Sequence, residues 1–92
     1  MEEMTIQLPE LFSVEEAARF REQVRGYIEK GIVRFTLDFS KCKFIDSTGL
    51  GVIVSSYKKC VENQGTIRLR SLDPNVRKIF ELTRLINVFE IQ

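Results

Sequence analysis

The stretch from Phe44 to Val54 reads Phe44-Ile45-Asp46-Ser47-Thr48-Gly49-Leu50-Gly51-Val52-Ile53-Val54. Two apolar residues lead into a polar Asp-Ser-Thr-Gly turn, and the turn opens directly into an apolar segment with helical spacing. The first turn of a helix has amide hydrogens without an intrahelical partner and lies at the positive end of the helix dipole. Asp46 and Ser47 are residue types that satisfy such amides, so the stretch predicts a helix that begins near Ser47.

Two interpretations of this helix start remain open from the residues alone. In the first, the polar residues form an ordinary N-cap before a tightly packed helix. In the second, a hydroxyl is displayed beside Gly49 and Gly51, whose missing side chains let another backbone or a partner approach closely. Free amides at a helix start favour an anion, but a phosphate adds about −1.5 to −2 charge. Beside Asp46, that charge would disrupt a partner surface built around a neutral Ser47.

A first helix is predicted from about Val14 to Lys30. The Ser13-Val14-Glu15-Glu16 segment has the pattern of a capping box, and Gly31 is suited to the position after the helix end. The inner stripe of this helix is predicted from apolar residues at helical spacing, namely Val14, Ala17, Phe20, Val24, Tyr27 and Ile28.

Two further helices follow in the sequence. The helix that begins near Ser47 is closed by Gly65, and a third begins at Asp73-Pro74, with Asp as N-cap and Pro at the first helical position. Their predicted inner stripes are Leu50, Ile53, Val54, Tyr57 and Val61 in the former, and Val76, Ile79, Phe80 and Thr83 in the latter. Val52 and Leu82 fall off these stripes. Each either packs against a neighbouring helix, or, for Val52, belongs to a patch that a partner covers.

Strands are predicted between the helices. Thr5–Leu8 forms a short strand that Pro9 ends, Phe44-Ile45 returns the chain to the core, and the other strands are Val33–Phe39, which is central, Thr66–Arg70 and Val88–Ile91. This alternation predicts an α/β domain with a small single sheet of about four mainly parallel strands and three to four helices. Arg68 and Arg70 share one side of their strand, which indicates either a partly solvated sheet face or an edge strand.

Length and charge limit the possible classes of protein. The 92 residues suffice for one domain, residues 1–92, and the formal net charge is only +1. A nucleic-acid-binding protein would usually carry a basic surplus, so we expect no direct binding of nucleic acid. No stretch is long and apolar enough to span a bilayer, and the acidic start lacks the features of a leader. We therefore expect no membrane insertion and a cytoplasmic location.

The residue types of metal and catalytic sites are scarce. The chain has no histidine, no Cys-x-x-Cys motif and no P-loop. A lone serine without a base in view does not indicate nucleophilic catalysis. We therefore expect no catalytic residue, no metal and no cofactor, and a protein that is not an enzyme. Cys42 and Cys60 are widely spaced and are expected to be buried, reduced thiols.

The segment from Phe44 to Tyr57, F-I-D-S-T-G-L-G-V-I-V-S-S-Y, resembles the signature of STAS domains, above all that of the anti-sigma factor antagonists. The similarity extends from about Val14 to Val88 and includes the turn at residues 71–76 and the helix at residues 79–83. Two segments depart from the family pattern. Residues 8–13 replace the family's Gly-x-[LI]-[DE] turn, which lies close to the phosphorylated site and helps to form the partner surface, and the chain ends where relatives often add a helix. Both departures are typical of a minimal version of the domain.

This resemblance implies a function that the residue pattern alone does not. In the family, the serine directly after the aspartate is phosphorylated by a partner that is both an anti-sigma factor and a serine kinase, and the matching residue is Ser47. The unphosphorylated antagonist binds that partner, the phosphorylated form releases it, and a phosphatase resets the cycle. The resemblance further implies that Asp46 supports the site and that Thr48 is its neighbour. Gly49, Gly51 and Val52 are the remaining candidates for supporting or partner contacts.

A second function remains open. The chain resembles a STAS subunit of a transport complex as well, for example a small protein that docks on an ABC transporter for lipids. In such a protein the same helix start is an interface and need not be phosphorylated. The complete Asp46–Gly51 string and the retained Ser47 favour the partner-switching regulator.

Overall fold

The computed structural model describes residues 2–92, so Met1, with which the predicted domain begins, lies outside the described residues. The order of elements is β1 (Glu3–Gln7), β2 (Leu11–Phe12), α1 (Val14–Glu29), β3 (Arg34–Asp38), β4 (Phe44–Ile45), α2 (Ser47–Glu62), β5 (Thr66–Arg70), α3 (Pro74–Leu82), the 3-10 helix η1 (Leu85–Asn87) and β6 (Glu90–Ile91). β1, β3, β5 and β6 form one parallel sheet in the order β1-β3-β5-β6. The predicted α/β class and the four-stranded parallel sheet are confirmed.

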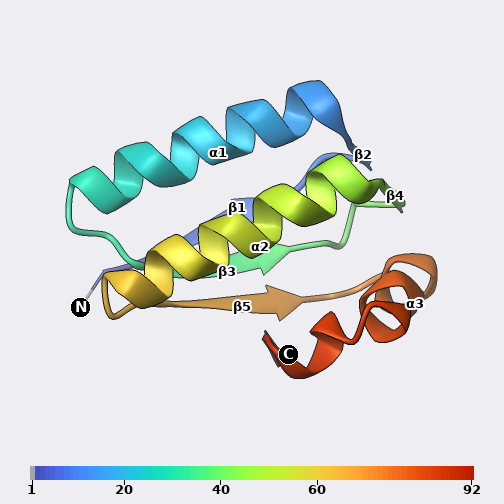
Figure 1. The fold of residues 1–92 in the computed structure, drawn as a ribbon. Helices are drawn as coiled ribbons and strands as arrows, with labels where there is room; N and C mark the ends of the chain where they lie inside the picture. The colour runs from blue at the N-terminus through green and yellow to red at the C-terminus, as the bar shows by residue number, and fades with distance from the viewer. Residues whose placement is uncertain (1) are drawn as a thin grey trace.

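Helices cover one face of this sheet (Figure 1). α1 and α2 pack side by side, and the strand side chains beneath them are apolar and buried, namely Ile6, Phe35, Leu37, Ile67 and Leu69. The strand positions between them carry polar residues. Side chains therefore alternate between an apolar face under the helices and a polar, partly solvated face, as the period of two requires, although Thr36 at the centre of β3 is also buried.

Charged side chains pair across the solvated face. Arg68 Nη1 lies 3.7 Å from Glu3 Oε1, and Arg68 Nε lies 2.7 Å from Glu90 Oε2. Arg70 lies 3.2 Å from Asp38, its neighbour on β3. Because β5 has β3 on one side and β6 on the other, the solvated-face interpretation of the two arginines is confirmed and the edge-strand interpretation is wrong.

Aromatic rings connect the sheet to the C-terminal segment. Phe80 packs edge-on against Phe39 and Phe89 at 5.9 Å between centroids, and Phe89 packs against Tyr57 of α2 at 5.0 Å. These contacts hold α3 and the last strand beneath α2. Cys42 and Cys60 are buried and free, as predicted, and burial raises the pKa of the Cys60 thiol to about 11.

A small parallel pair, β2 with β4, was not predicted. Leu11 pairs with Phe44, and Phe12 pairs with Ile45. Phe12 and Ile45 are buried, whereas Phe44 is 63% exposed, so only one of the two apolar residues before Asp46 returns to the core. Each strand has two residues, a length too short to show the alternation by which strands are recognised in a sequence.

The predicted face of α2 is displaced by one residue. The buried residues of this helix are Gly49, Val52, Ile53, Ser56 and Cys60. Leu50, Val54 and Tyr57 lie beside them in half-buried positions, and Val61 is exposed. Small side chains occupy the innermost stripe because α2 packs against both the sheet and α1, where there is little room.

The start of α1 also differs from its prediction. The helix begins at Val14 and its C-cap is Lys30, as predicted, and Gly31 after it has a positive φ of +87°. However, Val14 is 61% exposed, and the Ser13 side chain makes no capping hydrogen bond within α1. The predicted capping box is therefore wrong, because the Ser13 hydroxyl has a partner elsewhere. None of the helices in residues 2–92 combines the length and the apolar character that a bilayer crossing needs.

Two glycines offer a matched test of the packing. A Cβ at Gly65 would overlap the Val33 backbone, whereas no atom lies within 4 Å of a Cβ at Gly26, inside α1. We expect Gly65→Ala to lower the free energy of unfolding by about 1–3 kcal/mol through overpacking. We expect Gly26→Ala to raise it by about 0.5–1 kcal/mol, since alanine favours a helix interior. Urea denaturation measures both, and equal shifts in the two variants would contradict the packing of the α2–β5 connection.

Candidate functional site

Asp46 is the N-cap of α2. Its backbone is extended, with φ −105° and ψ −177°, and its carboxylate Oδ1 accepts a hydrogen bond of 2.9 Å from the Gly49 amide. Ser47 is the first residue within the helix and is exposed. No described residue in 2–92 forms a hydrogen bond with the Ser47 hydroxyl. The aspartate thus caps the helix, and the serine hydroxyl is left free and accessible.

The other carboxylate oxygen of Asp46 faces the start of α1. Asp46 Oδ2 accepts a hydrogen bond from Ser13 Oγ, across 33 positions of sequence. This bond, followed by the bonds from the Gly49 and Thr48 amides, lowers the pKa of Asp46 below its ordinary value. Asp46 is therefore an anion at neutral pH, directly beside the free hydroxyl of Ser47. The family resemblance placed residues 8–13 close to the site, but Ser13 was not among the predicted site residues, because its pattern with Glu16 indicated a local cap.

Gly49 brings β2 close to the start of α2. A Cβ at this position would overlap the Phe12 carbonyl oxygen and lie 2.7 Å from Phe12 Cδ2. Gly49 is buried, so the prediction that its missing side chain admits another backbone is confirmed. Gly49 therefore lies within the packing of the helix start and not on its exposed surface.

Gly51 and Thr48 lie on the accessible side of the same helix start. Both are exposed, and no atom lies within 4 Å of a Cβ built at Gly51. Val52 is different, because it is only 7% exposed and belongs to the core. The packing interpretation of Val52 is therefore confirmed, and its assignment to a partner-covered patch is wrong. Leu82, in contrast, is 74% exposed and does not pack against a neighbouring helix.

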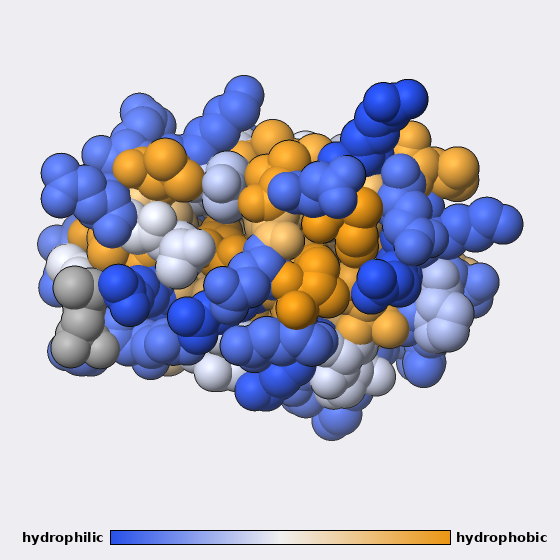
Figure 2. All heavy atoms as spheres, turned by 90° about the horizontal axis from the view of Figure 1, so that it is seen from below, coloured by the Kyte–Doolittle hydropathy of each residue, from blue (hydrophilic) through white to orange (hydrophobic). Residues whose placement is uncertain are grey.

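An open groove of about 430 Å³ begins at Ser47. It runs between α2 and the segment that links α3 to η1. Carbon atoms form most of its lining surface, and the lining residues are Ser47, Leu50, Gly51, Val54, Ser55, Lys58, Thr83 and Leu85. Figure 2 views the molecule from below, the side on which β5 and α3 lie in Figure 1, and shows apolar side chains gathered between charged ones. Apolar surface beside an accessible hydroxyl is a feature of protein-protein interfaces.

The chain is similar to proteins of one family. The STAS domain family model matches residues 3–92. The anti-sigma-B factor antagonist of Listeria monocytogenes is 32% identical over 77 residues, which cover 83% of this chain and 67% of the relative. The chain spans 65% and 67% of the lengths of the first two curated relatives that it matches.

Two solved structures have a similar fold. A candidate anti-sigma factor antagonist of Thermotoga maritima is 29% identical with a TM-score of 0.84, over 95% of this chain and 77% of that chain. The phosphorylated form of SpoIIAA, a Bacillus cell fate determinant, is 20% identical with a TM-score of 0.77, over 96% of this chain and 80% of that chain. At this lower identity, the similarity to SpoIIAA shows the fold alone.

The Ser13–Asp46 hydrogen bond can be tested by titration. Removing the hydroxyl in Ser13→Ala should raise the Asp46 pKa towards its ordinary value, and Ser13→Thr should retain the lowered pKa. Carboxyl chemical shifts followed by NMR over the acidic range measure this directly. Because the folded-state pKa is depressed, the stabilisation from Asp46 is present above the unfolded-state pKa and is lost as pH falls through the folded-state pKa. An identical Asp46 midpoint in wild type and Ser13→Ala would show that the bond is absent in solution.

Proposed function

The chain belongs to the STAS domain family, and from this membership we propose that it is an anti-sigma factor antagonist controlled by phosphorylation of Ser47. The observation that carries the proposal is the exposed Ser47 hydroxyl, free of intramolecular hydrogen bonds to residues 2–92 and adjacent to the anionic Asp46. Unphosphorylated, the protein binds an anti-sigma factor with serine kinase activity, and phosphorylation releases it. A phosphatase hydrolyses the phosphoserine and restores the binding form.

The free hydroxyl suits phosphoryl transfer. The Ser47 oxygen attacks the γ-phosphorus of ATP held by the kinase, the bond from phosphorus to ADP breaks, and the hydroxyl proton passes to a base of the kinase. Asp46 satisfies the Gly49 amide throughout, so α2 keeps its cap while the serine reacts. This chain supplies a positioned hydroxyl, and the kinase supplies the remaining chemistry.

The charge added by the reaction explains the release. A phosphate brings about −1.5 to −2 charge to a position next to the Asp46 carboxylate. A partner that covers Ser47 and the neighbouring groove would have to bury both charges, which is costly without a matching cation. The helix start itself tolerates the phosphate, because the dipole favours an anion there. The fold is thus retained while the interface is lost.

The transport-docking alternative has less support. The relatives that match this chain are named as anti-sigma factor antagonists, and their names support the regulatory function. The alternative needs only an interface at α2 and does not require the unpartnered hydroxyl. A transporter ATPase that binds the wild type and Ser47→Asp equally well would favour it instead.

Substitutions at Ser47 test the switch. We expect Ser47→Ala to bind the kinase partner as the wild type does and to resist phosphorylation, which intact-mass measurement after incubation with kinase and ATP detects. We expect Ser47→Asp to bind at least about tenfold more weakly by calorimetry. The matched control is Gln64→Glu, which adds one negative charge beyond the far end of α2 and should bind normally. Equal affinity of Ser47→Ala and Ser47→Asp would contradict the proposal.

A substitution at Gly51 tests whether the partner covers the start of α2. Since the space around Gly51 is open, Gly51→Glu should leave the thermal midpoint unchanged or raise it, as glycine is a poor helix former. The same change should weaken partner binding at least about tenfold, because a charged side chain would enter the interface. The control is Gly26→Glu in the interior of α1, also in open space. Normal binding by Gly51→Glu would place the partner elsewhere.

A further inference from the structure

A second groove, of about 400 Å³, lies between α1 and α2; it shares Ser55 with the Ser47 groove, and its other lining residues are different. Its lining consists of Arg21, Val24, Arg25, Ile28, Ser55, Ser56 and Lys59. Its central polar residue, Ser56, lies more than two helical turns beyond Ser47, about 14 Å along the α2 axis at about 1.5 Å per residue. The groove has an aliphatic floor and a rim of cations, with no carboxylate among the lining residues.

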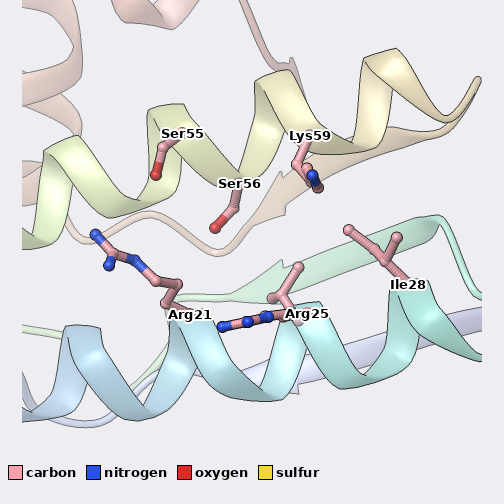
Figure 3. Close-up of a pocket in the computed structure, with 7 residues that line it drawn as sticks. Arg21, Arg25, Ile28, Ser55, Ser56 and Lys59 are labelled. Carbon is pink, nitrogen blue, oxygen red and sulfur yellow. The ribbon is translucent and has the colours of Figure 1, made fainter.

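The two helices present these side chains in facing rows. Arg21 and Arg25 are four residues apart on α1, and Ser55 and Lys59 are four residues apart on α2, so each pair follows one helix face. Figure 3 shows the Arg21 side chain extending towards α2 and the Lys59 side chain on the α2 side of the same groove. The cations therefore flank one space from both sides.

The cations differ in their partners. Arg25 lies 3.3 Å from Glu22 and 3.8 Å from Glu29, in exposed pairs on its own helix. Arg21 and Lys59 form no ion pair with any residue in the described range 2–92. Arg21 and Lys59 are exposed and place positive charge on both sides of a groove whose lining has no carboxylate, so the lining is complementary to an anionic ligand.

The hydroxyl of Ser56 faces the same space (Figure 3). Ser56 is only 5% exposed, and its side chain forms no hydrogen bond with residues 2–92. Its oxygen points towards α1 in Figure 3. Ser55 is different, because its hydroxyl donates to the Val52 carbonyl oxygen at 3.0 Å. The Ser56 oxygen is not among the solvent-inaccessible side-chain atoms that lack a hydrogen-bond partner in residues 2–92, so it opens into the groove, where water or a polar ligand group can bind it.

We propose that the groove between α1 and α2 binds a small amphiphilic anion, with its carboxylate or phosphate head between Arg21 and Lys59 and its alkyl part on Val24 and Ile28. The cavity lies at the lower end of the size range of small-molecule sites, so the ligand is small. The floor is aliphatic and contains no aromatic ring on which a planar base would stack, so a flexible alkyl group fits it better. The Ser56 hydroxyl donates to the head group.

The experiment is an amide NMR titration of the complete chain with sodium octanoate and, separately, with octyl phosphate. We expect saturable shifts along residues 21–28 and 55–59 with at least one of the two, and the tighter ligand identifies the head group. 1-Octanol tests whether the charge is needed, and acetate and inorganic phosphate test whether the alkyl part is needed. Each of these three should bind at least about tenfold more weakly than the tighter amphiphile.

A pair of double variants tests the location. Arg21→Gln with Lys59→Gln should weaken binding of the tighter amphiphile at least about tenfold. The matched control is Arg19→Gln with Lys58→Gln, which removes the same charges from the same two helices outside this groove and should not change the affinity. A second measurement on the unmodified protein is salt dependence, since added NaCl should weaken a binding mode that depends on exposed cations.

The results that would overturn the proposal are distinct. The absence of a saturable shift with either amphiphile would show that the groove does not bind this class of ligand. Equal binding of 1-octanol would show that the groove binds the alkyl part alone and does not require the charge. Equal binding of inorganic phosphate would reduce it to a general anion site. Unchanged affinity in the Arg21–Lys59 variant would place the ligand elsewhere. None of these outcomes bears on the Ser47 switch, because Ser47 does not line this groove.

Discussion

The Asp46 carboxylate is the interaction on which the start of α2 depends. One of its oxygens accepts from the Gly49 amide, and the other accepts from the Ser13 hydroxyl. A helix start needs one such acceptor for its free amides. Because the Asp46 carboxylate is that acceptor, the helix does not depend on the Ser47 hydroxyl for its cap. The exposed Ser47 hydroxyl can therefore be modified while the helix keeps its cap.

The same interaction explains why the N-terminal segment belongs to the site. The hydrogen bond from Ser13 and the close approach of Phe12 to Gly49 hold the chain between β2 and α1 against the first turn of α2. The β2–β4 pair extends this contact on the other side of Asp46. A substitution in β2 or at Ser13 can therefore alter the surface around Ser47 without changing Ser47 itself.

The sheet face and the helical side of the molecule differ in how their charged side chains are paired. On the solvated face of the sheet, Arg68 and Arg70 pair with carboxylates of neighbouring strands. On the helical side, α1 and α2 leave Arg21 and Lys59 without ion-pair partners in residues 2–92. Near-neutrality of the whole chain therefore conceals a local surplus of positive charge in the groove between the helices. The two grooves meet at Ser55, but Ser47 does not line the groove between the helices.

The sequence by itself determined the class of fold and the phosphorylation candidate. Helical spacing, the Asp-Pro helix start and the position of Gly31 identify elements because each depends on residues close in sequence. Asp46 as a helix cap follows from the same local chemistry, whereas Ser47 as the phosphorylation candidate is implied by the resemblance of residues 44–57 to STAS domains. Only the tertiary structure assigned Ser13 to Asp46, because that bond joins residues 33 positions apart and competes with a plausible local cap. Likewise, the burial of Val52 and the small-residue stripe of α2 depend on how closely α1 and the sheet approach, and a one-dimensional pattern of apolar residues does not contain that distance.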